Sequence, residues 1–426
     1  MSAAAKFSEK GQSLALTSQS STSSSSTEMT KTVCFRAICK SHQSYWFAVN
    51  ISFEAEEELE SKRKGRDPDE EDLMARFCGR RHHHFDGVTY GKFPTLEHDI
   101  QPYSTAKLSH RSSWALLGSK LYCVGGSLHE LNKSKKKKSD YSRLVRVFDF
   151  NFPHNGWNKN LSLMISRREM PGLAVLDGKL YVFGGTGWCN KKSPWAEVYD
   201  PSVDKWEALP QPPPYIIDTI EDTPSFVVAL HNLKKIVLDE YLFDVITSSW
   251  EILKEDCRDC CDRAVNQQPV AVQDTIYWWS DRYGSDGYES LGGCPYIYAY
   301  DFSEMKLFQG PLKGLEHDTV ISDSRSNLLH MGGECFCLLW CHGLTKTQYH
   351  CTQLQVSKQG QGVLNARVLS CQSFLAPGKT SLFQAQMLGI SLHEDNRQDE
   401  ASASLEVVSN NGRKLQDVTN HQAILV

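Results

Sequence analysis

The sequence predicts an all-β protein built as a β-propeller of about six four-stranded blades. The stretch "GLAVLDGKLYVFGG" (172–185) has a close copy in "SWALLGSKLYCVGG" (113–126). An aromatic–Asp pair followed by a spaced Trp also recurs, and few windows show helical apolar spacing. The recurring aspartates lie about 50 residues apart, which is typical of propeller blades. They are Asp149, Asp200, Asp244 and Asp301.

Each repeat residue has an expected physical role. Glycine pairs after the second strand lack Cβ atoms, so that neighbouring blades can approach closely. Tyrosines in the same strands fill the space between sheets. The aspartates begin turns, and the tryptophans begin and cover the outer strand. The residues assigned to these roles are Gly125, Gly126, Gly184, Gly185, Tyr122, Tyr181, the four aspartates, Trp157, Trp206 and Trp250.

Five blades can be read directly from the sequence, and strands near both ends supply a sixth. Five or seven blades remain as alternatives. In blade 223–255, Asp239-Glu240 takes the glycine-pair position. In blade 326–370, Gly332-Gly333 matches a hairpin turn, and Leu339-Trp340 takes the glycine-pair position. The predicted blades are 110–165, 168–210, 223–255, 266–311 and 326–370, with 33–54 and 380–392 forming the sixth.

The domain prediction is one propeller over residues 31–392, with clear repeats in 110–210 and degenerate repeats elsewhere. A charged insertion is expected at about 54–86. The Ser-rich segment 1–30 and most of the polar tail 393–426 are expected to be disordered, because they can bury little apolar surface.

Composition narrows the class of protein. The formal net charge is −5, so no strongly basic nucleic-acid surface is indicated. No apolar run approaches the roughly 20 residues that cross a bilayer, and the N-terminus does not resemble a signal peptide. The 14 cysteines then suit a reducing compartment. The sequence therefore predicts a cytoplasmic or nuclear protein that binds neither nucleic acid nor membrane.

A Gly-Gly pair after a Tyr-containing strand, then Tyr/Phe-Asp and a spaced Trp, resembles the kelch repeat. The stretch "WAEVYDPSVDKWEALPQPP" is similar to the plant F-box/kelch-repeat family, and the resemblance extends over about 31–390. The resemblance implies a protein that holds a substrate for a cullin-based ubiquitin ligase through a helical F-box. No F-box is recognisable here, because the first 30 residues are Ser-rich and strand-like sequence begins near Val33. Binding of a ligase adaptor is therefore in doubt, and the resemblance leaves two alternatives, a substrate-recognition part of a ubiquitin ligase and a free-standing kelch protein.

No catalytic, cofactor or metal site is predicted. Cys257, Cys260 and Cys261 offer one zinc hook without a second, while Cys335 and Cys337 alternate on a strand as core residues. The histidines of "RRHHHFD" (80–86) are expected in a polar loop.

Some kelch proteins are enzymes, and plant specifier proteins bind iron through Glu-x3-Asp-x3-His. The nearest match here is Glu240, Asp244 and Ser248, where the histidine is missing. The sequence thus favours a non-catalytic interaction protein with a protein partner of unknown identity. The alternative is a free-standing kelch enzyme or a metal-dependent, specifier-like protein.

Three long loops are expected on one face of the propeller, where a partner would bind. The loops are 127–142, 186–195 and 282–295, and the first contains the lysine run of "KSKKKK" (133–138). That run could also be an import signal or a solvated loop. Aromatic and arginine side chains are enriched in binding hot spots. The candidate binding residues are Arg111, Arg168, Trp188, Trp195, Tyr283 and Tyr288. The alternative is that these loops are neutral insertions.

Overall fold

The structure is a computed structural model, and part of the chain is described. The described residues are 29–39, 44–53, 97–99, 104–106, 111–127, 141–186, 193–217, 222–224, 226–253, 269–280, 295–314, 326–342, 347–376 and 380–387. The chain divides into two units. The first, Met1–Met29 with Ser52–Arg81, lies almost wholly outside the described residues, as do the predicted insertion and polar tail. The second, Thr30–Ile51 with His82–Val426, contains nearly all the described strands.

The described strands form six blades of four strands, each ordered from its innermost strand outward. Blade 1 contains β25 (Thr380–Met387), β1 (Met29–Cys39), β2 (Ser44–Phe53) and β4 (Ser104–Ala106). Blade 2 contains β5 (Ser113–Leu117), β6 (Lys120–Val124), β7 (Val145–Asp149) and β8 (Trp157–Asn158). Blade 3 contains β9 (Gly172–Leu176), β10 (Lys179–Phe183), β11 (Ala196–Asp200) and β12 (Lys205–Ala208).

The remaining blades follow in sequence order. Blade 4 contains β13 (Val227–Leu230), β14 (Lys235–Leu238), β15 (Tyr241–Asp244) and β16 (Ser249–Ile252). Blade 5 contains β17 (Val270–Val272), β18 (Thr275–Ser280), β19 (Tyr296–Asp301) and β20 (Lys306–Lys313). Blade 6 contains β21 (Asn327–Gly332), β22 (Cys335–His342), β23 (Gln348–Gln359) and β24 (Val363–Leu375). Short helical turns are α4 (Pro214–Ile217), η1 (Pro153–Asn155) and η2 (Gly360–Gly362).

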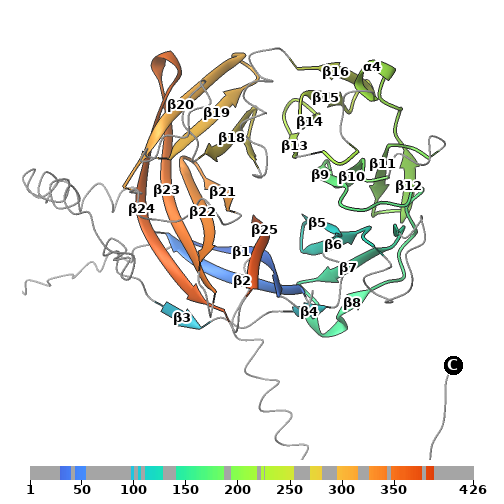
Figure 1. The fold of residues 1–426 in the computed structure, drawn as a ribbon, viewed down its shortest axis with the longest axis horizontal. Helices are drawn as coiled ribbons and strands as arrows, with labels where there is room; N and C mark the ends of the chain where they lie inside the picture. Colours follow the sequence, from blue (N-terminus) through green and yellow to red (C-terminus); the bar gives the residue numbers. More distant parts are fainter. Residues whose placement is uncertain are drawn as a thin grey trace, which may run out of the picture. The chain divides into compact units, whose positions relative to one another are not determined.

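The inner strands close a ring. Contacts run from β5 through β9, β13, β17 and β21 to β25, and β25 contacts β5 again (Figure 1). The C-terminal strand β25 pairs antiparallel with the N-terminal strand β1, with Val33 opposite Met387. The backbone N–H of Leu116 donates to the Gln386 side chain at 2.7 Å, which ties β25 to blade 2. The structure therefore confirms the six-bladed propeller and its closure by strands from both ends.

Aromatic side chains fill the space between blades. The Tyr122 and Tyr199 rings of blades 2 and 3 have centroids 6.0 Å apart, and the Phe183 and Phe243 rings of blades 3 and 4 have centroids 6.2 Å apart. The Trp206 indole N–H donates to the Ser162 carbonyl oxygen at 3.0 Å. Burial of such rings stabilises the contact between blades by about 25 cal/mol per Å² of apolar surface. The repeat aromatics of successive blades therefore share common hydrophobic clusters.

The recurring aspartates form the predicted turns. In all four blades that carry the aspartate, its Oδ1 accepts a hydrogen bond from the backbone N–H two residues later. The hydrogen bonds run from Asn151 to Asp149 (3.0 Å), from Ser202 to Asp200 (3.0 Å), from Ile246 to Asp244 (2.9 Å) and from Ser303 to Asp301 (2.9 Å). These bonds fix the hairpin between the third and fourth strands.

The glycine pairs allow close contact with the next blade. Gly125 has φ +72°, and a Cβ there would lie 2.6 Å from the Arg168 carbonyl oxygen. The Gly126 N–H donates to that same oxygen at 2.9 Å, and the Gly185 N–H donates to the Asp222 carbonyl oxygen at 2.5 Å. A side chain at the pair would both strain the backbone and block these contacts. The glycine pairs thus lie where one blade meets the segment that leads into the next.

One feature of the sheets was not predicted. The outer strands β20 and β24 pair in parallel, with Gln309 opposite Val363, so that blades 5 and 6 share one sheet. The short strand β3 (Glu97–Asp99) pairs with β24 further along. Gly332 and Cys335 flank the β21–β22 turn, and Leu339 lies within β22, as expected.

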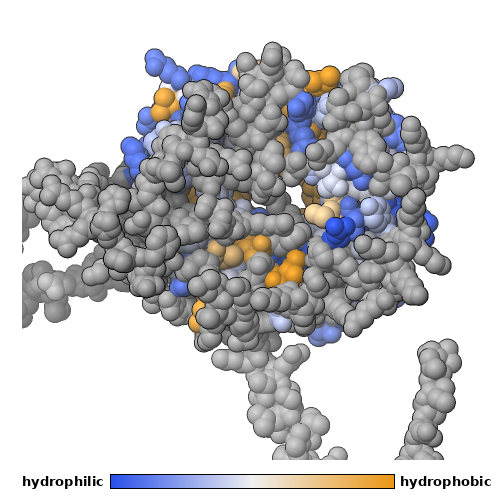
Figure 2. Space-filling model, viewed as in Figure 1, coloured by the Kyte–Doolittle hydropathy of each residue, from blue (hydrophilic) through white to orange (hydrophobic). Residues whose placement is uncertain are grey.

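The surface of the described residues is mixed in polarity. Figure 2 shows hydrophobic side chains in separate places on the visible face, with hydrophilic ones between them. Among the described residues, no helix is long and apolar enough to cross a membrane.

Candidate functional site

Strand direction assigns two different faces to the propeller. Within a blade, one loop connects the second strand to the third, and after the fourth strand a linker leads into the next blade. Both connections lie at the same end of the strands, as the bridges Ser127–Tyr141 and Ser142–Arg168 show. We call this end the linker face. The opposite end, with the hairpin turns after Leu117 and Asp149, is the turn face. The predicted loops begin and end on the linker face.

A chain of polar contacts crosses the linker face from blade 2 to blade 4. Arg111, before blade 2, forms an ion pair with Glu169, before blade 3, at 2.7 Å. The Glu169 N–H donates to the Gly185 carbonyl oxygen at 2.7 Å. Next to it, the backbone N–H and the hydroxyl of Thr186 each donate to the Asp222 carboxylate at 3.2 Å. The segments that precede three successive blades are thus held together.

Charge is concentrated at this point and partly open to solvent. The Arg111 side chain is 47% exposed and that of Glu169 is 11% exposed. Burial, followed by the negative charges of Glu169 and Asp222, raises the pKa of Tyr141, while the Arg111 charge opposes the rise. The Tyr141 hydroxyl also forms a hydrogen bond with the Glu169 carboxylate, so it belongs to the same polar cluster. The cluster of Arg111, Tyr141, Glu169, Thr186 and Asp222 offers charges of both signs at the ends of two loops.

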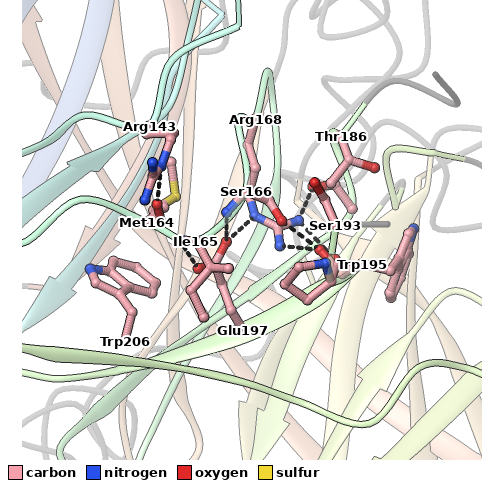
Figure 3. Close-up of polar contacts among 12 residues, drawn as sticks. Arg143, Met164, Ile165, Ser166, Arg168, Thr186, Ser193, Trp195, Glu197 and Trp206 are labelled. Atoms are coloured by element: carbon pink, nitrogen blue, oxygen red, sulfur yellow. Dashed lines mark hydrogen bonds and ion pairs between the residues drawn. The ribbon is translucent and has the colours of Figure 1, made fainter. Parts of the chain in front are cut away.

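Arg168 does not face a partner, which corrects the prediction from sequence. Its side chain is fully buried and its Nε donates to Glu197, also fully buried, at 2.7 Å. Its two other nitrogens donate to the carbonyl oxygens of Gly184, Pro194 and Trp195 at 2.5 to 2.9 Å. Figure 3 shows the guanidinium between the strand that carries Glu197 and the segment at Trp195.

The Arg168–Glu197 pair is a structural support beneath the linker face. Burial lowers the pKa of Arg168, and the charge and hydrogen bond of Glu197 oppose this effect. Glu197 also accepts hydrogen bonds from the backbone N–H groups of Ile165 (2.6 Å) and Ser166 (3.2 Å). The pair thereby joins the segment that leaves blade 2 to the third strand of blade 3.

The prediction that Trp195 lies on the binding surface is also corrected by the structure. It is 7% exposed and packs against Phe183 and Trp250, with centroid distances of 6.2 Å and 5.7 Å. It belongs to the core between blades 3 and 4 rather than to a binding surface. Trp188, Tyr283 and Tyr288 lie outside the described residues, as do most of loops 127–142, 186–195 and 282–295. Of the candidate binding residues, Arg111 is the one seen at the described surface.

Sequence reasoning missed Glu169, Asp222 and Tyr141. A signal was present, because an acidic residue stands two positions before a proline ahead of blades 3 and 4, in Glu169-Met-Pro171 and Asp222-Thr-Pro224. The kelch-like repeat is defined by residues in and beside the strands. Glu169 and Asp222 instead lie between blades, and Tyr141 lies at the end of a loop within blade 2.

The cysteines seen in the structure are mainly core residues. Cys337 is buried on β22, as predicted, and Cys335 is half-buried. Among the described residues, no group of three or more His, Cys, Asp or Glu side chains could hold a metal ion. Cys257, Cys260, Cys261 and the three adjacent histidines fall outside the described part of the chain.

Comparison with known proteins agrees with the geometry of the repeat. The Kelch motif family matches residues 167–213, which contain blade 3 and the Arg168 support. The chain is a β-propeller that contains a Kelch motif. It is similar to F-box/kelch-repeat proteins of Arabidopsis thaliana. At4g19870 is 26% identical over 256 residues, covering 58% of this chain and 57% of that protein. At4g39550 is 29% identical over 111 residues, covering 26% and 25%.

A third relative, At4g19330 from the same plant, is 32% identical over 125 residues, covering 28% of this chain and 30% of that protein. The kelch propeller therefore matches little more than half the length of the first relative and about a quarter to a third of the other two. These matches agree with an interaction protein, since kelch repeats support protein–protein contacts.

Proposed function

We propose that this kelch propeller is a non-catalytic interaction protein that binds a protein partner on its linker face. The observation that carries the proposal is the Arg111–Glu169 pair, which joins the segments that lead into blades 2 and 3 beside Tyr141 and Asp222. Loops on a rigid scaffold are common positions for binding residues. The closed ring and the buried Arg168–Glu197 pair below supply that rigidity.

The composition of the loops favours a protein partner with an acidic surface. Loop 127–142 contains Lys133 and Lys135 to Lys138, and loop 186–195 contains Lys191 and Lys192. Trp188, Tyr283 and Tyr288 add aromatic side chains of the type that dominate binding energy in interfaces. We expect lysines to influence mainly the association rate and aromatics mainly the dissociation rate.

Charge reversal of Arg111 tests this proposal. A partner is first identified by proximity labelling with the full chain, and its affinity is then measured with purified protein. Arg111→Glu should weaken binding by about tenfold or more, because it removes a cation and repels an acidic partner. The matched control is Lys205→Glu on the turn face, since Lys205 also forms an exposed ion pair, at 2.8 Å with Glu207. Equal affinity of the Arg111 variant and the parent would exclude the linker face.

A second, finer proposal is that the partner is a substrate of a ubiquitin ligase. The F-box/kelch-repeat names of the similar plant proteins favour this role. A pull-down of the purified chain with the ligase adaptor provides the test. Direct, saturable binding would support a receptor that joins the ligase by itself. Failure to bind, which the sequence predicts, would favour a free-standing interaction protein.

A further inference from the structure

A groove of about 580 Å³ opens on the turn face of blade 2, beside the β7–β8 hairpin. This hairpin is longer than its equivalents, because eight positions separate Asp149 from Trp157 and six separate Asp200 from Trp206. The additional residues form the turn η1 and leave Phe152 53% exposed at the edge of the groove. Trp157 is half-buried against Trp46 and Phe148 and also lines the groove, which gives the groove an aromatic side.

In blades 3 and 4 the equivalent lysine forms an ion pair with a carboxylate of its own blade, the repeat aspartate in blade 3 and the glutamate after the repeat Trp in blade 4. The first residue of the second strand is a lysine in all three blades: Lys120, Lys179 and Lys235. Lys179 lies 3.1 Å from Asp200, and Lys235 lies 3.3 Å from Glu251. Glu207 and Glu251 directly follow the repeat Trp, and the equivalent residue in blade 2 is the neutral Asn158.

The ammonium groups of blade 2 differ from those of blades 3 and 4. Neither Lys120 nor Lys159, which both line the groove, forms an ion pair with any residue that the structure describes. The Asp149 carboxylate also lines the groove, opposite Lys120 on the neighbouring strand, but it accepts hydrogen bonds from the Ser119 hydroxyl and the Asn151 N–H, each at 3.0 Å. With two lysines and one aspartate, the groove carries a net positive charge. An anion from outside could approach both lysines together with the Asn158 amide.

We propose that this groove binds an acidic peptide segment of another protein. A carboxylate of the segment would contact Lys120, Lys159 and Asn158, in the place that Glu251 takes in blade 4. A neighbouring apolar side chain would pack on Phe152 and Trp157. A peptide fits both halves of the groove, since it can present a charge and an apolar group together. The site is separate from the linker face, because Lys120 begins β6 and Val124 ends it at the other face.

Fluorescence anisotropy with two labelled synthetic peptides tests the proposal on the full chain. The acidic probe is Glu-Asp-Phe-Asp-Glu, and its uncharged twin is Gln-Asn-Phe-Asn-Gln. The acidic probe should bind saturably, and the twin should bind at least about tenfold more weakly because charged hydrogen bonds are lost. Binding of both peptides with equal affinity, or of neither, would overturn the proposal.

The decisive variant is Asn158→Glu, which gives blade 2 the carboxylate that blade 4 already has. It should pair with Lys120, weaken the acidic probe at least about tenfold and leave the melting temperature unchanged or higher. Lys235→Gln, the matched change in blade 4, should leave binding unaltered. The proposal fails if Asn158→Glu binds like the parent, or if Lys235→Gln weakens the probe as much.

Discussion

We expect Arg168→Met to destabilise the propeller much more than Arg111→Met, although each arginine lies 2.7 Å from a glutamate oxygen. The two pairs differ in burial. Arg168 and Glu197 are both 0% exposed, whereas Arg111 and Glu169 are 47% and 11% exposed. Burial decides the outcome, because a charge left without its partner cannot be compensated by water.

The magnitude follows from the groups that lose a donor. Without its guanidinium, the buried Glu197 keeps only the Ile165 and Ser166 N–H donors, and three carbonyl oxygens lose a hydrogen bond. Breaking one partner of a buried ion pair costs about 3–5 kcal/mol. Loss of the more exposed Arg111 pair should cost about 0–1 kcal/mol.

Urea denaturation followed by tryptophan fluorescence measures both free energies of unfolding. A double variant, Arg168→Met with Glu197→Met, should recover part of the loss, because the unpaired charge is then removed as well. If Arg168→Met and Arg111→Met unfold at the same urea concentration, the buried pair does not support the linker face as described.

Two further changes test the repeat and its electrostatics. Gly184→Val should lower the free energy of unfolding by about 1–3 kcal/mol or more, because a Cβ at this position would overlap the Asp222 carbonyl oxygen and because Gly184 has φ +63°. An unchanged melting temperature would contradict this expectation. Burial disfavours ionised Asp301, but hydrogen bonds from Lys358, Ser303 and Glu304 outweigh it and lower the pKa of Asp301. The stabilisation of the folded state by ionised Asp301 is fully present above the unfolded-state pKa of about 4. It is lost as the pH falls towards the lowered pKa that Asp301 has in the folded state. In urea titrations, Lys358→Met should therefore lower the free energy of unfolding by about 1.5–3 kcal/mol at pH 7 and by less below pH 4. A loss of stability that does not change with pH would refute this role of Lys358.

The predictable part of this fold is the part that is local to one repeat. The Asp200 turn, the Gly184-Gly185 pair and Trp206 each act within a blade or against the next one in a fixed way. Their spacing in the sequence therefore carried the information. The β20–β24 pairing joins outer strands of two blades, and no local spacing marks such a contact.

The candidate site was less predictable, because sequence position does not determine burial. Arg168 and Arg111 both precede a blade, yet only Arg168 finds a buried carboxylate and three carbonyl oxygens. Trp195 lies at the end of an expected surface loop, but the packing of blade 4 covers it. Glu169 and Asp222 become neighbours of the site through contacts between blades, which a repeat alignment does not represent.

The most direct test of the central claim is hydrogen–deuterium exchange of the full chain with and without its identified protein partner. Binding on the linker face should slow exchange in the segments that lead into blades, 111–113, 167–171 and 222–224. Exchange in the hairpin turns 201–204 and 245–248, on the turn face, should stay the same. Protection confined to those hairpin turns, with none at 111–113 or 167–171, would contradict the account.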